Sequence, residues 1–284
     1  MPVTAPSPLH GRVVLITGAN TGIGLATARE LARRGARVFV ACRSAEKART
    51  AIEDIRRSSG NQQIEALELD LADLDSVRRC ARELLAREMP LHVLINNAGL
   101  AGARGLTASG FEIAFGVNHV GHFLLTHLLL DRLKESAPAR IVTVASKAHY
   151  RAPGIDWTAV HQPTRSRTGL DEYGVSKLAN VLFSAELARR LAGSGVTTYA
   201  LHPGVVASDV WRSVPWPLRS LLKLAMITTE EGAATTLHCA TSPAVADQSG
   251  LYYDRCREKT PSLAARDPAL AAELWRRSLE WVGA

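Results

Sequence analysis

The chain has 284 residues, too many for a peptide-like module and too few for two ordinary enzyme domains, so we expect one large domain or at most two small ones. Its 46% hydrophobic and 21% charged residues are typical of a globular protein and exclude disorder along the whole chain. The net charge is +7, but 28 of the 34 basic residues are arginines, scattered from Arg12 to Arg277 without a basic stripe. We therefore predict that the protein does not bind nucleic acid.

Short runs rich in β-branched residues alternate with longer helical segments. The predicted strands are residues 12–17, 37–41, 63–69, 92–95, 140–145, 196–201 and 251–253. The predicted helices are residues 23–34, 45–58, 74–88, 111–136, 171–192, 229–241 and 268–281. Residues 13–16 are apolar at every position, as expected for a strand buried on both faces. The alternation predicts a single α/β domain over residues 1–284, with a doubly wound parallel sheet of seven strands.

Three segments outside these elements carry predictions of their own. Residues 147–170 and 203–220 are long, irregular and follow strands, so they are expected to lie at the carboxyl edge of the sheet and cover a substrate. Residues 1–10 are expected to form a flexible N-terminus.

The sequence also bears on location. The first ten residues lack the basic start and apolar run of a signal peptide, and the four cysteines lack metal-ligand spacing. Uncharged residues 113–130 and 191–208 are long enough to span a bilayer, but the first contains Asn118 and three histidines and the second contains Pro203. We therefore expect a reduced, soluble, cytoplasmic protein without a membrane anchor.

A glycine-rich turn directly follows the first strand. Glycines there allow the backbone to approach a pyrophosphate at the N-terminus of a helix, where free N–H groups favour anions. A lone glycine trio can equally be a structural turn. The turn and the helix start contribute Gly18, Asn20, Thr21, Gly22, Ile23 and Gly24. The pattern TGxxxGIG resembles that of the short-chain dehydrogenase/reductases, a family with a Rossmann-type fold.

The end of the second strand bears on the cofactor. In the family's alignment Cys42 takes the place of the acid that an NAD enzyme uses for the ribose hydroxyl, and Arg43 follows it. A guanidinium suits a 2′-phosphate, so NADP(H) is favoured over NAD(H). Alternatively, Arg43 is a solvated surface residue.

Two further motifs extend the expected cofactor site. Asp70 and Leu71 after the third strand resemble the family's contact at the edge of the adenine, although Asp70 could equally cap the following turn. Asn97, Ala98 and Gly99 belong to an NNAG motif, which in the family braces the sheet and lines the cofactor cleft.

The chemistry-bearing pattern is Tyr173-x-x-x-Lys177. Residues four apart share one helix face, so the Lys177 ammonium can lower the pKa of the Tyr173 phenol. By itself this spacing is common on surface helices. The family resemblance adds Ser146 to hold the substrate oxygen and Asn118 to hold a water in the proton relay. It also implies cofactor contacts from Pro203, Gly204, Val206 and Ser208.

The gap of 27 residues between Ser146 and Tyr173 is about twice the family's usual one, and with motifs such as YALHPG it is similar to the retinol-dehydrogenase-like branch. The resemblance implies an NADP(H)-dependent oxidoreductase that interconverts an alcohol and an apolar aldehyde or ketone. Trp157, Trp211, Trp216 and Met226 could line an apolar pocket or simply pack.

Several alternatives stay open. His119 and His122 share a helix face, but helix packing is favoured over a metal site, and no metal is predicted. The family also implies a homodimer through helices 111–136 and 171–192. The alternative function is a nucleotide-binding regulator or scaffold that has lost turnover.

Overall fold

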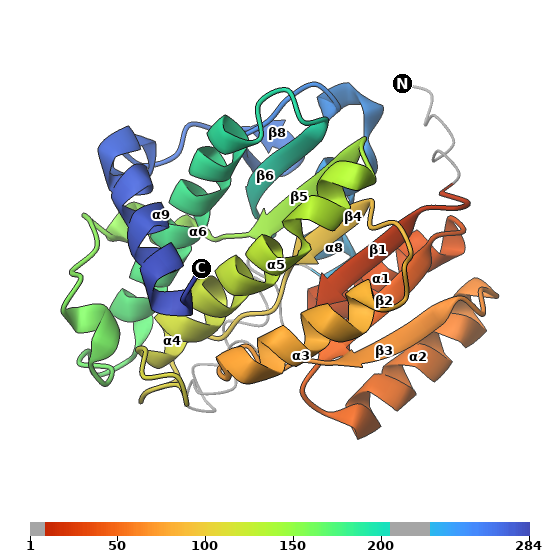
Figure 1. The fold of residues 1–284 in the computed structure, drawn as a ribbon, viewed down its shortest axis with the longest axis horizontal. Helices are drawn as coiled ribbons and strands as arrows, with labels where there is room; N and C mark the ends of the chain where they lie inside the picture. Colours follow the sequence, from red (N-terminus) through yellow and green to blue (C-terminus); the bar gives the residue numbers. More distant parts are fainter. Residues whose placement is uncertain (1–8, 205–227) are drawn as a thin grey trace.

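An eight-stranded sheet forms the centre of the molecule, and the computed structural model describes residues 9–204 and 228–284 (Figure 1). The order across the sheet is β3-β2-β1-β4-β5-β6-β7-β8. The strands are β1 (Val13–Thr17), β2 (Arg37–Cys42), β3 (Ile64–Glu68), β4 (Val93–Asn96), β5 (Ala139–Val144), β6 (Val196–His202), β7 (Leu251–Asp254) and β8 (Arg257–Glu258). The strands β1 to β7 pair in parallel, as the sequence predicts.

Helices cover both faces of this sheet, with one apolar core on each side. On one face lie α1 (Gly22–Arg33), α2 (Ala45–Ser59) and α8 (Thr229–Thr241). On the other lie α3 (Leu74–Leu85), α5 (Gly121–Glu135) and α6 (Leu170–Arg190), with α9 (Pro268–Val282) packed on α6. The shorter helical pieces are α4 (Ile113–Phe115), η1 (Gly116–Val120), η2 (Lys147–Arg151), η3 (Ala159–His161), η5 (Pro243–Val245) and η6 (Ala264–Arg266).

The direction of the crossovers reverses beside β1. β1 pairs with β2 on one side and with β4 on the other. The helices that follow β1 and β4 therefore lie on opposite faces of the sheet and diverge. In open α/β sheets this divergence leaves a crevice at the carboxyl ends of the strands, where ligands bind. The glycine-rich turn after β1 therefore lies at the natural binding position of the fold.

The prediction of seven strands was wrong by one, because a short antiparallel strand, β8, pairs with β7. The two residues between these strands, Arg255 and Cys256, have φ values of 53° and 59°. Such tight hairpin turns usually contain Asn and Gly, which tolerate this conformation. The usual signal of a hairpin is therefore missing from the sequence.

The predicted helix 111–136 is present but interrupted. It consists of α4, a turn of π-helix at η1, and α5. Glu112 caps its start by accepting a hydrogen bond from the Phe115 N–H at 2.9 Å. Gly116 and Gly121 bound the π turn, and at both positions a Cβ would lie within 2.5 Å of a neighbouring segment. The π turn thus packs tightly against Thr107 and against Leu71, which follows β3.

Residues 113–135 are long and apolar enough to cross a membrane by length and composition alone. In the structure, 72% of the most apolar window of this helix is buried inside the molecule. Its apolar side chains therefore form part of the protein core.

The C-terminal helix α9 packs against helices from which the family resemblance implies a dimer. Trp275 of α9 lies 5.0 Å from the Phe123 ring of α5 and 6.0 Å from the Phe183 ring of α6, between ring centroids. Arg190 packs over the other side of Trp275, at 4.6 Å from the ring centroid. The implied homodimer stays a prediction.

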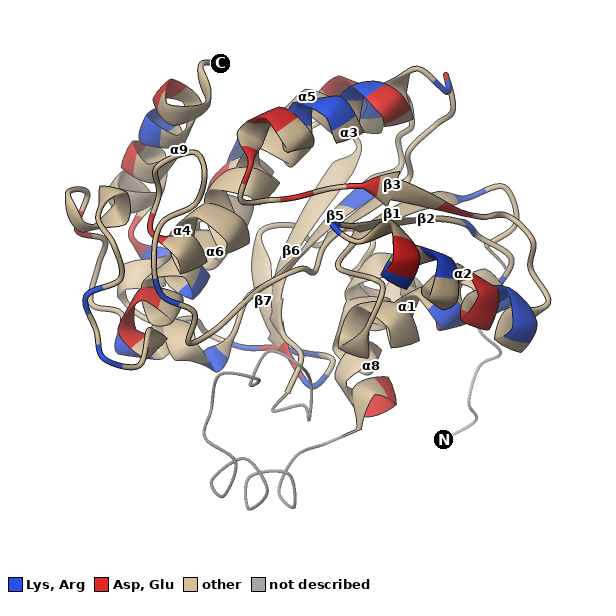
Figure 2. Cartoon of the chain, turned by 90° about the horizontal axis from the view of Figure 1, so that it is seen from below, with Lys and Arg blue, Asp and Glu red and all other residues tan. Residues whose placement is uncertain are grey.

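Charged side chains of both signs lie beside one another on the outer helices, as Figure 2 shows for α2 and α9. Ion pairs such as Arg57–Asp54 on α2 and Arg277–Glu273 on α9 join them. Of the N-terminal segment predicted to be flexible, residues 1–8 lie outside the described residues, whereas Leu9 donates a hydrogen bond to the Arg34 carbonyl at 2.7 Å.

Candidate active site

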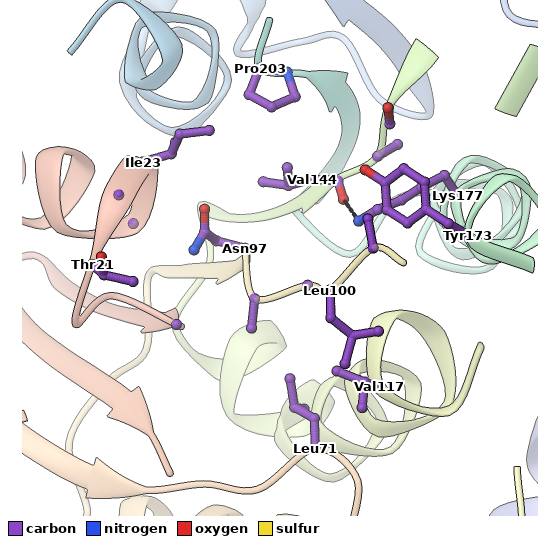
Figure 3. Close-up of a pocket in the computed structure, with 18 of the residues that line it drawn as sticks. Thr21, Ile23, Leu71, Asn97, Leu100, Val117, Val144, Tyr173, Lys177 and Pro203 are labelled. Atoms are coloured by element: carbon purple, nitrogen blue, oxygen red, sulfur yellow. Dashed lines mark hydrogen bonds between the residues drawn. The ribbon is translucent and has the colours of Figure 1, made fainter. Parts of the chain in front are cut away.

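A cavity of about 800 Å³ opens at the carboxyl edge of the sheet. Figure 3 shows Thr21, Ile23 and Asn97 on one side of it and Tyr173 and Lys177 across from them. It is lined by most of the residues predicted from the sequence: Gly18, Asn20, Thr21, Gly22, Ile23, Gly24, Arg43, Asp70, Leu71, Asn97, Ala98, Gly99, Ser146, Tyr173, Lys177, Pro203 and Gly204. Val206 and Ser208 fall outside the described residues.

The glycine turn fits closely against the NNAG motif. A Cβ on Gly24 would lie 2.5 Å from the Asn97 amide nitrogen and 2.6 Å from the Gly18 carbonyl oxygen, so only glycine fits there. The first turn of α1 contains no acidic residue. Its N–H groups and the helix dipole therefore favour a phosphate or another anion beside the turn.

Thr17, at the end of β1, connects these two segments. Its hydroxyl oxygen accepts hydrogen bonds from the N–H groups of Asn97 and Ala98, both at 2.9 Å. The same oxygen lies 2.8 Å from Nε2 of His122. The Asn97 side chain in turn donates to the Thr17 carbonyl at 2.8 Å. Thr17 thus fixes the turn that forms the floor of the cavity.

The tautomer of His122 follows from its partners. Nδ1 lies 3.1 Å from the Asn118 carbonyl oxygen, which can only accept, so Nδ1 carries the proton and Nε2 accepts from the Thr17 hydroxyl. Burial lowers the pKa of His122 to about 4, which keeps the ring neutral. The sequence analysis assigned His122 to helix packing, and the structure places it between a glycine-turn residue and a predicted catalytic residue.

The far end of the cavity lies beyond the carboxyl end of β2. Arg43 lines it, as predicted, and so does Lys47 in the first turn of α2. Ser44 caps α2 by accepting a hydrogen bond from the Lys47 N–H at 3.2 Å. Both cations are exposed, whereas Cys42 is buried. Sequence reasoning missed Lys47, because Arg43 precedes the Ser44 cap of α2 and helical spacing does not relate the two residues.

Asp70 caps the turn after β3, and its predicted contact with the adenine stays a prediction. Its carboxylate accepts a hydrogen bond from the Ala72 N–H at 2.9 Å, which caps the turn. It also lines the cavity, and among the described lining residues it is the single acid. The adjacent Leu71 lines the cavity beside it.

Ser146, Tyr173 and Lys177 meet at the opposite end. Ser146 lies two residues beyond the end of β5 and caps η2 by accepting from the Ala148 N–H at 3.1 Å. Lys177 is buried, donates to the Val144 carbonyl at 2.8 Å, and lies 5.7 Å from the centre of the Tyr173 ring. Helical spacing on α6 and the end of a neighbouring strand therefore bring the three predicted catalytic side chains together.

Burial dominates the electrostatics of this group. Burial raises the pKa of Tyr173, and a hydrogen bond with Ser146 lowers it by less. Burial also lowers the pKa of Lys177 to about 7. The chain alone therefore favours a protonated Tyr173, and the lowering of the Tyr173 pKa by Lys177 stays a prediction. Desolvation explains both directions, because it disfavours the charged form of either group.

The Asn118 side chain lies close to this group but is fully engaged. Its amide donates to the Leu100 carbonyl at 3.1 Å and to the Ser176 hydroxyl at 2.8 Å, and its oxygen accepts from the Leu100 N–H at 2.9 Å. A Cβ on Gly99 would lie 3.3 Å from the Asn118 oxygen and 3.4 Å from the Lys177 nitrogen. Asn118 therefore holds the 99–100 backbone against Lys177, and its predicted contact with a water stays a prediction.

The peptide group between Ser146 and Lys147 is held by two histidines. His149 Nδ1 lies 2.6 Å from the Ser146 carbonyl oxygen, and its Nε2 accepts from the Ser262 N–H at 3.2 Å. On the other side, His202 Nδ1 accepts from the Lys147 N–H at 3.4 Å. These contacts fix the backbone that carries the Ser146 hydroxyl.

Of the two predicted covering segments, 147–170 is described in full and the second only at residues 203–204. Within 147–170, the residues Lys147, Ala148, Arg151 and Leu170 line the cavity. Trp157 instead packs against Trp281, at 6.2 Å between ring centroids, and Arg277 lies over its ring. Trp211, Trp216 and Met226 lie outside the described residues, as does 205–220 of the second segment.

Comparison with known proteins agrees with this geometry. The family described as short chain dehydrogenase matches residues 12–216. Human retinol dehydrogenase 11 is 48% identical over 284 residues, covering 99% of this chain and 88% of that protein. The chain belongs to the short-chain dehydrogenase/reductase family. Its similarity to the retinol dehydrogenases extends over nearly its whole length and places it in their branch.

Solved structures extend the comparison to the fold. An uncharacterised protein from Mycobacterium paratuberculosis superposes with a TM-score of 0.80 at 36% identity, covering 100% of this chain and 97% of that one. An actinorhodin polyketide ketoreductase solved with NADPH gives a TM-score of 0.68 at 26% identity, covering 85% and 94%. This short-chain dehydrogenase/reductase is therefore an oxidoreductase of the alcohol–carbonyl type with a nicotinamide-cofactor fold.

Proposed function

We propose that this protein is an NADP(H)-dependent oxidoreductase that interconverts an aldehyde or ketone and the corresponding alcohol on a largely apolar substrate. The observation that carries the proposal is the single cavity that joins the glycine turn after β1 to the side chains of Ser146, Tyr173 and Lys177. Its spacing supports an extended dinucleotide, because β2 and β5 are three strand intervals apart, about 14 Å.

The bound nicotinamide would supply the hydride that reaches the carbonyl carbon. Ser146 donates a hydrogen bond to the carbonyl oxygen, and Tyr173 transfers its phenolic proton to that oxygen as the alcohol forms. The raised pKa of Tyr173 keeps this proton in place at neutral pH. Lys177, fixed by the Val144 carbonyl, lies beside the Tyr173 ring and stabilises the phenolate that the transfer leaves.

The decisive experiment follows NADPH oxidation with medium-chain, aromatic and retinoid aldehydes. Tyr173→Phe removes the transferable proton, and we expect kcat/KM to fall by about 10²–10⁴-fold while NADPH still binds. Tyr150→Phe makes the same chemical change at a tyrosine that bonds the Thr260 carbonyl, and it should retain turnover. Undiminished turnover in Tyr173→Phe would contradict the proposed mechanism. NADPH binding without turnover of any aldehyde would favour the regulator or scaffold.

The preference for NADP(H) is proposed from Arg43 and Lys47, two exposed cations that line the cavity beyond β2. A 2′-phosphate accepts charge-assisted hydrogen bonds from both, whereas a 2′-hydroxyl carries no charge to attract them. We expect the double substitution Arg43→Gln, Lys47→Gln to lower the ratio of kcat/KM for NADPH over NADH by about 10²-fold. Arg49→Gln, on the same helix but outside the cavity lining, is the control. An unchanged ratio in the double variant would refute this assignment.

A further inference from the structure

The end of the cavity near Ser146 has walls of different character. One wall is the 100–103 segment, which closely approaches the start of α6, where a Cβ on Gly169 would lie 2.8 Å from the Ala103 carbonyl oxygen. This segment and α6 contribute the apolar lining residues Leu100, Ala101, Ala103 and Leu170. The facing wall is η2, which approaches α6 where a Cβ on Gly174 would lie 3.2 Å from the Ala148 carbonyl oxygen.

The η2 wall presents cations. In a 3₁₀-helix, side chains three residues apart lie over one another, which places Arg151 above Ala148, and both line the cavity. Lys147 lines it as well. Arg151 is exposed and forms no ion pair within the described part of the chain. The single acidic lining residue that the structure describes, Asp70, follows β3 on the opposite side of the sheet.

Lys147 is held in place by a shared carboxylate. Its ammonium lies 3.1 Å from Asp254, and the ammonium of Lys259 lies 3.2 Å from the same oxygen atom. Asp254 is buried, and two cations on one carboxylate leave a net positive charge beside the cavity. The neighbouring His202 lies in this positive field. Its pKa is lowered to about 4, mainly by burial and secondly by the charge of Lys147.

A site with an apolar wall, a wall of net positive charge and a proton donor between them selects an amphiphilic molecule. Resting on the proposed function, we propose that the substrate is an aldehyde or ketone with an apolar body and a terminal carboxylate, and that Arg151 and Lys147 bind this carboxylate. The apolar segment then lies against Leu100 and Leu170 while the carbonyl oxygen meets Ser146 and Tyr173.

The test compares a homologous series of straight-chain aldehydes that end in a carboxylate with their methyl esters, which keep the length and lose the charge. We expect the best acid to exceed its ester in kcat/KM by about tenfold, the ratio that one charge-assisted hydrogen bond supports. Added salt should reduce this preference, because it screens exposed charges. Arg151→Gln should remove most of it, Arg151→Lys should restore part, and Arg167→Gln, an exposed arginine outside the lining, should keep it.

Each outcome decides the inference. Equal or faster turnover of every ester, or an acid preference that survives the double substitution Arg151→Gln, Lys147→Gln, overturns it while leaving the proposed function intact. Weaker NADPH binding by Arg151→Gln, measured by nicotinamide fluorescence, would reassign Arg151 to the cofactor and also overturn it. Failure to turn over both acids and esters while aromatic or retinoid aldehydes react would overturn this inference alone, and failure to turn over any aldehyde would overturn the proposed function as well.

Discussion

At the scale of single residues, the site depends on side chains that hold backbone in place. Thr17 and His122 do not line the described cavity, yet they fix the NNAG turn and the Asn118 carbonyl that border it. Because their polar groups are buried, each lost partner leaves an unsatisfied group, which costs more than the lost hydrogen bond itself. The structure thus gives Thr17 and His122 a positioning role that the sequence did not indicate.

Thr17→Val tests this network with a change that preserves shape. It removes the acceptor of two N–H groups and the donor to His122, so we expect the free energy of unfolding to fall by about 3 kcal/mol. Urea unfolding provides the measurement. Thr50→Val, an exposed threonine that donates to the Glu46 carbonyl, should shift it by less than about 0.5 kcal/mol. A loss at Thr17 no larger than at Thr50 would contradict the proposed network.

At the scale of elements, the cavity is shaped by helices that pack closely against the segments following the strands. The π turn at η1 brings Gly121 against the Leu71 backbone, where a Cβ would lie 2.5 Å from the Leu71 carbonyl oxygen. Backbone cannot move aside as a side chain can. The start of α5 and the turn after β3 can therefore approach each other this closely only because residue 121 has no side chain.

Gly121→Ala should separate these two elements. We expect it to lower the free energy of unfolding by about 1–3 kcal/mol, as overpacking does, and to weaken NADPH binding because Leu71 lines the cavity. Unfolding by urea and fluorescence titration with NADPH measure the two effects. Gly154→Ala, where no atom lies within 4 Å of the added Cβ, should change neither. Full stability and affinity in Gly121→Ala would show that the contact relaxes freely.

At the scale of the whole molecule, buried histidines connect the helices of one layer. His119 lies beneath α9, with Nε2 3.0 Å from the Ser278 hydroxyl, and its ring packs near Phe115 and Phe183. Burial lowers its pKa to about 3, far below the ordinary value of 6.5. Between these values the unfolded chain binds the proton and the folded chain does not, so stability decreases as pH falls below about 6.5.

The pH dependence of unfolding tests this coupling. His119→Gln can retain the contact with Ser278 but does not titrate, so the slope of unfolding free energy against pH between 4 and 6 should decrease by up to about 1.4 kcal/mol per pH unit. Ser278→Ala removes the same hydrogen bond and keeps the histidine, so it should lower stability at every pH without changing the slope. An unchanged slope in His119→Gln would show that His119 does not contribute.

The sequence by itself determined the α/β fold, the seven parallel strands, the glycine turn and the placement of Tyr173 and Lys177 on one helix face. These follow from local patterns, because periodicity places strands and helices and a spacing of four residues fixes one helix face. Ser146 entered through the family resemblance and not through a local pattern. Tertiary structure decided what depends on contacts between distant segments: the hydrogen bonds of Thr17 with His122, the coverage of α5 and α6 by Trp275, and the raised pKa of Tyr173. It also revealed β8, whose turn residues carry no ordinary hairpin signal. Burial and close approach are properties of the packed chain, and no window of neighbouring residues encodes them.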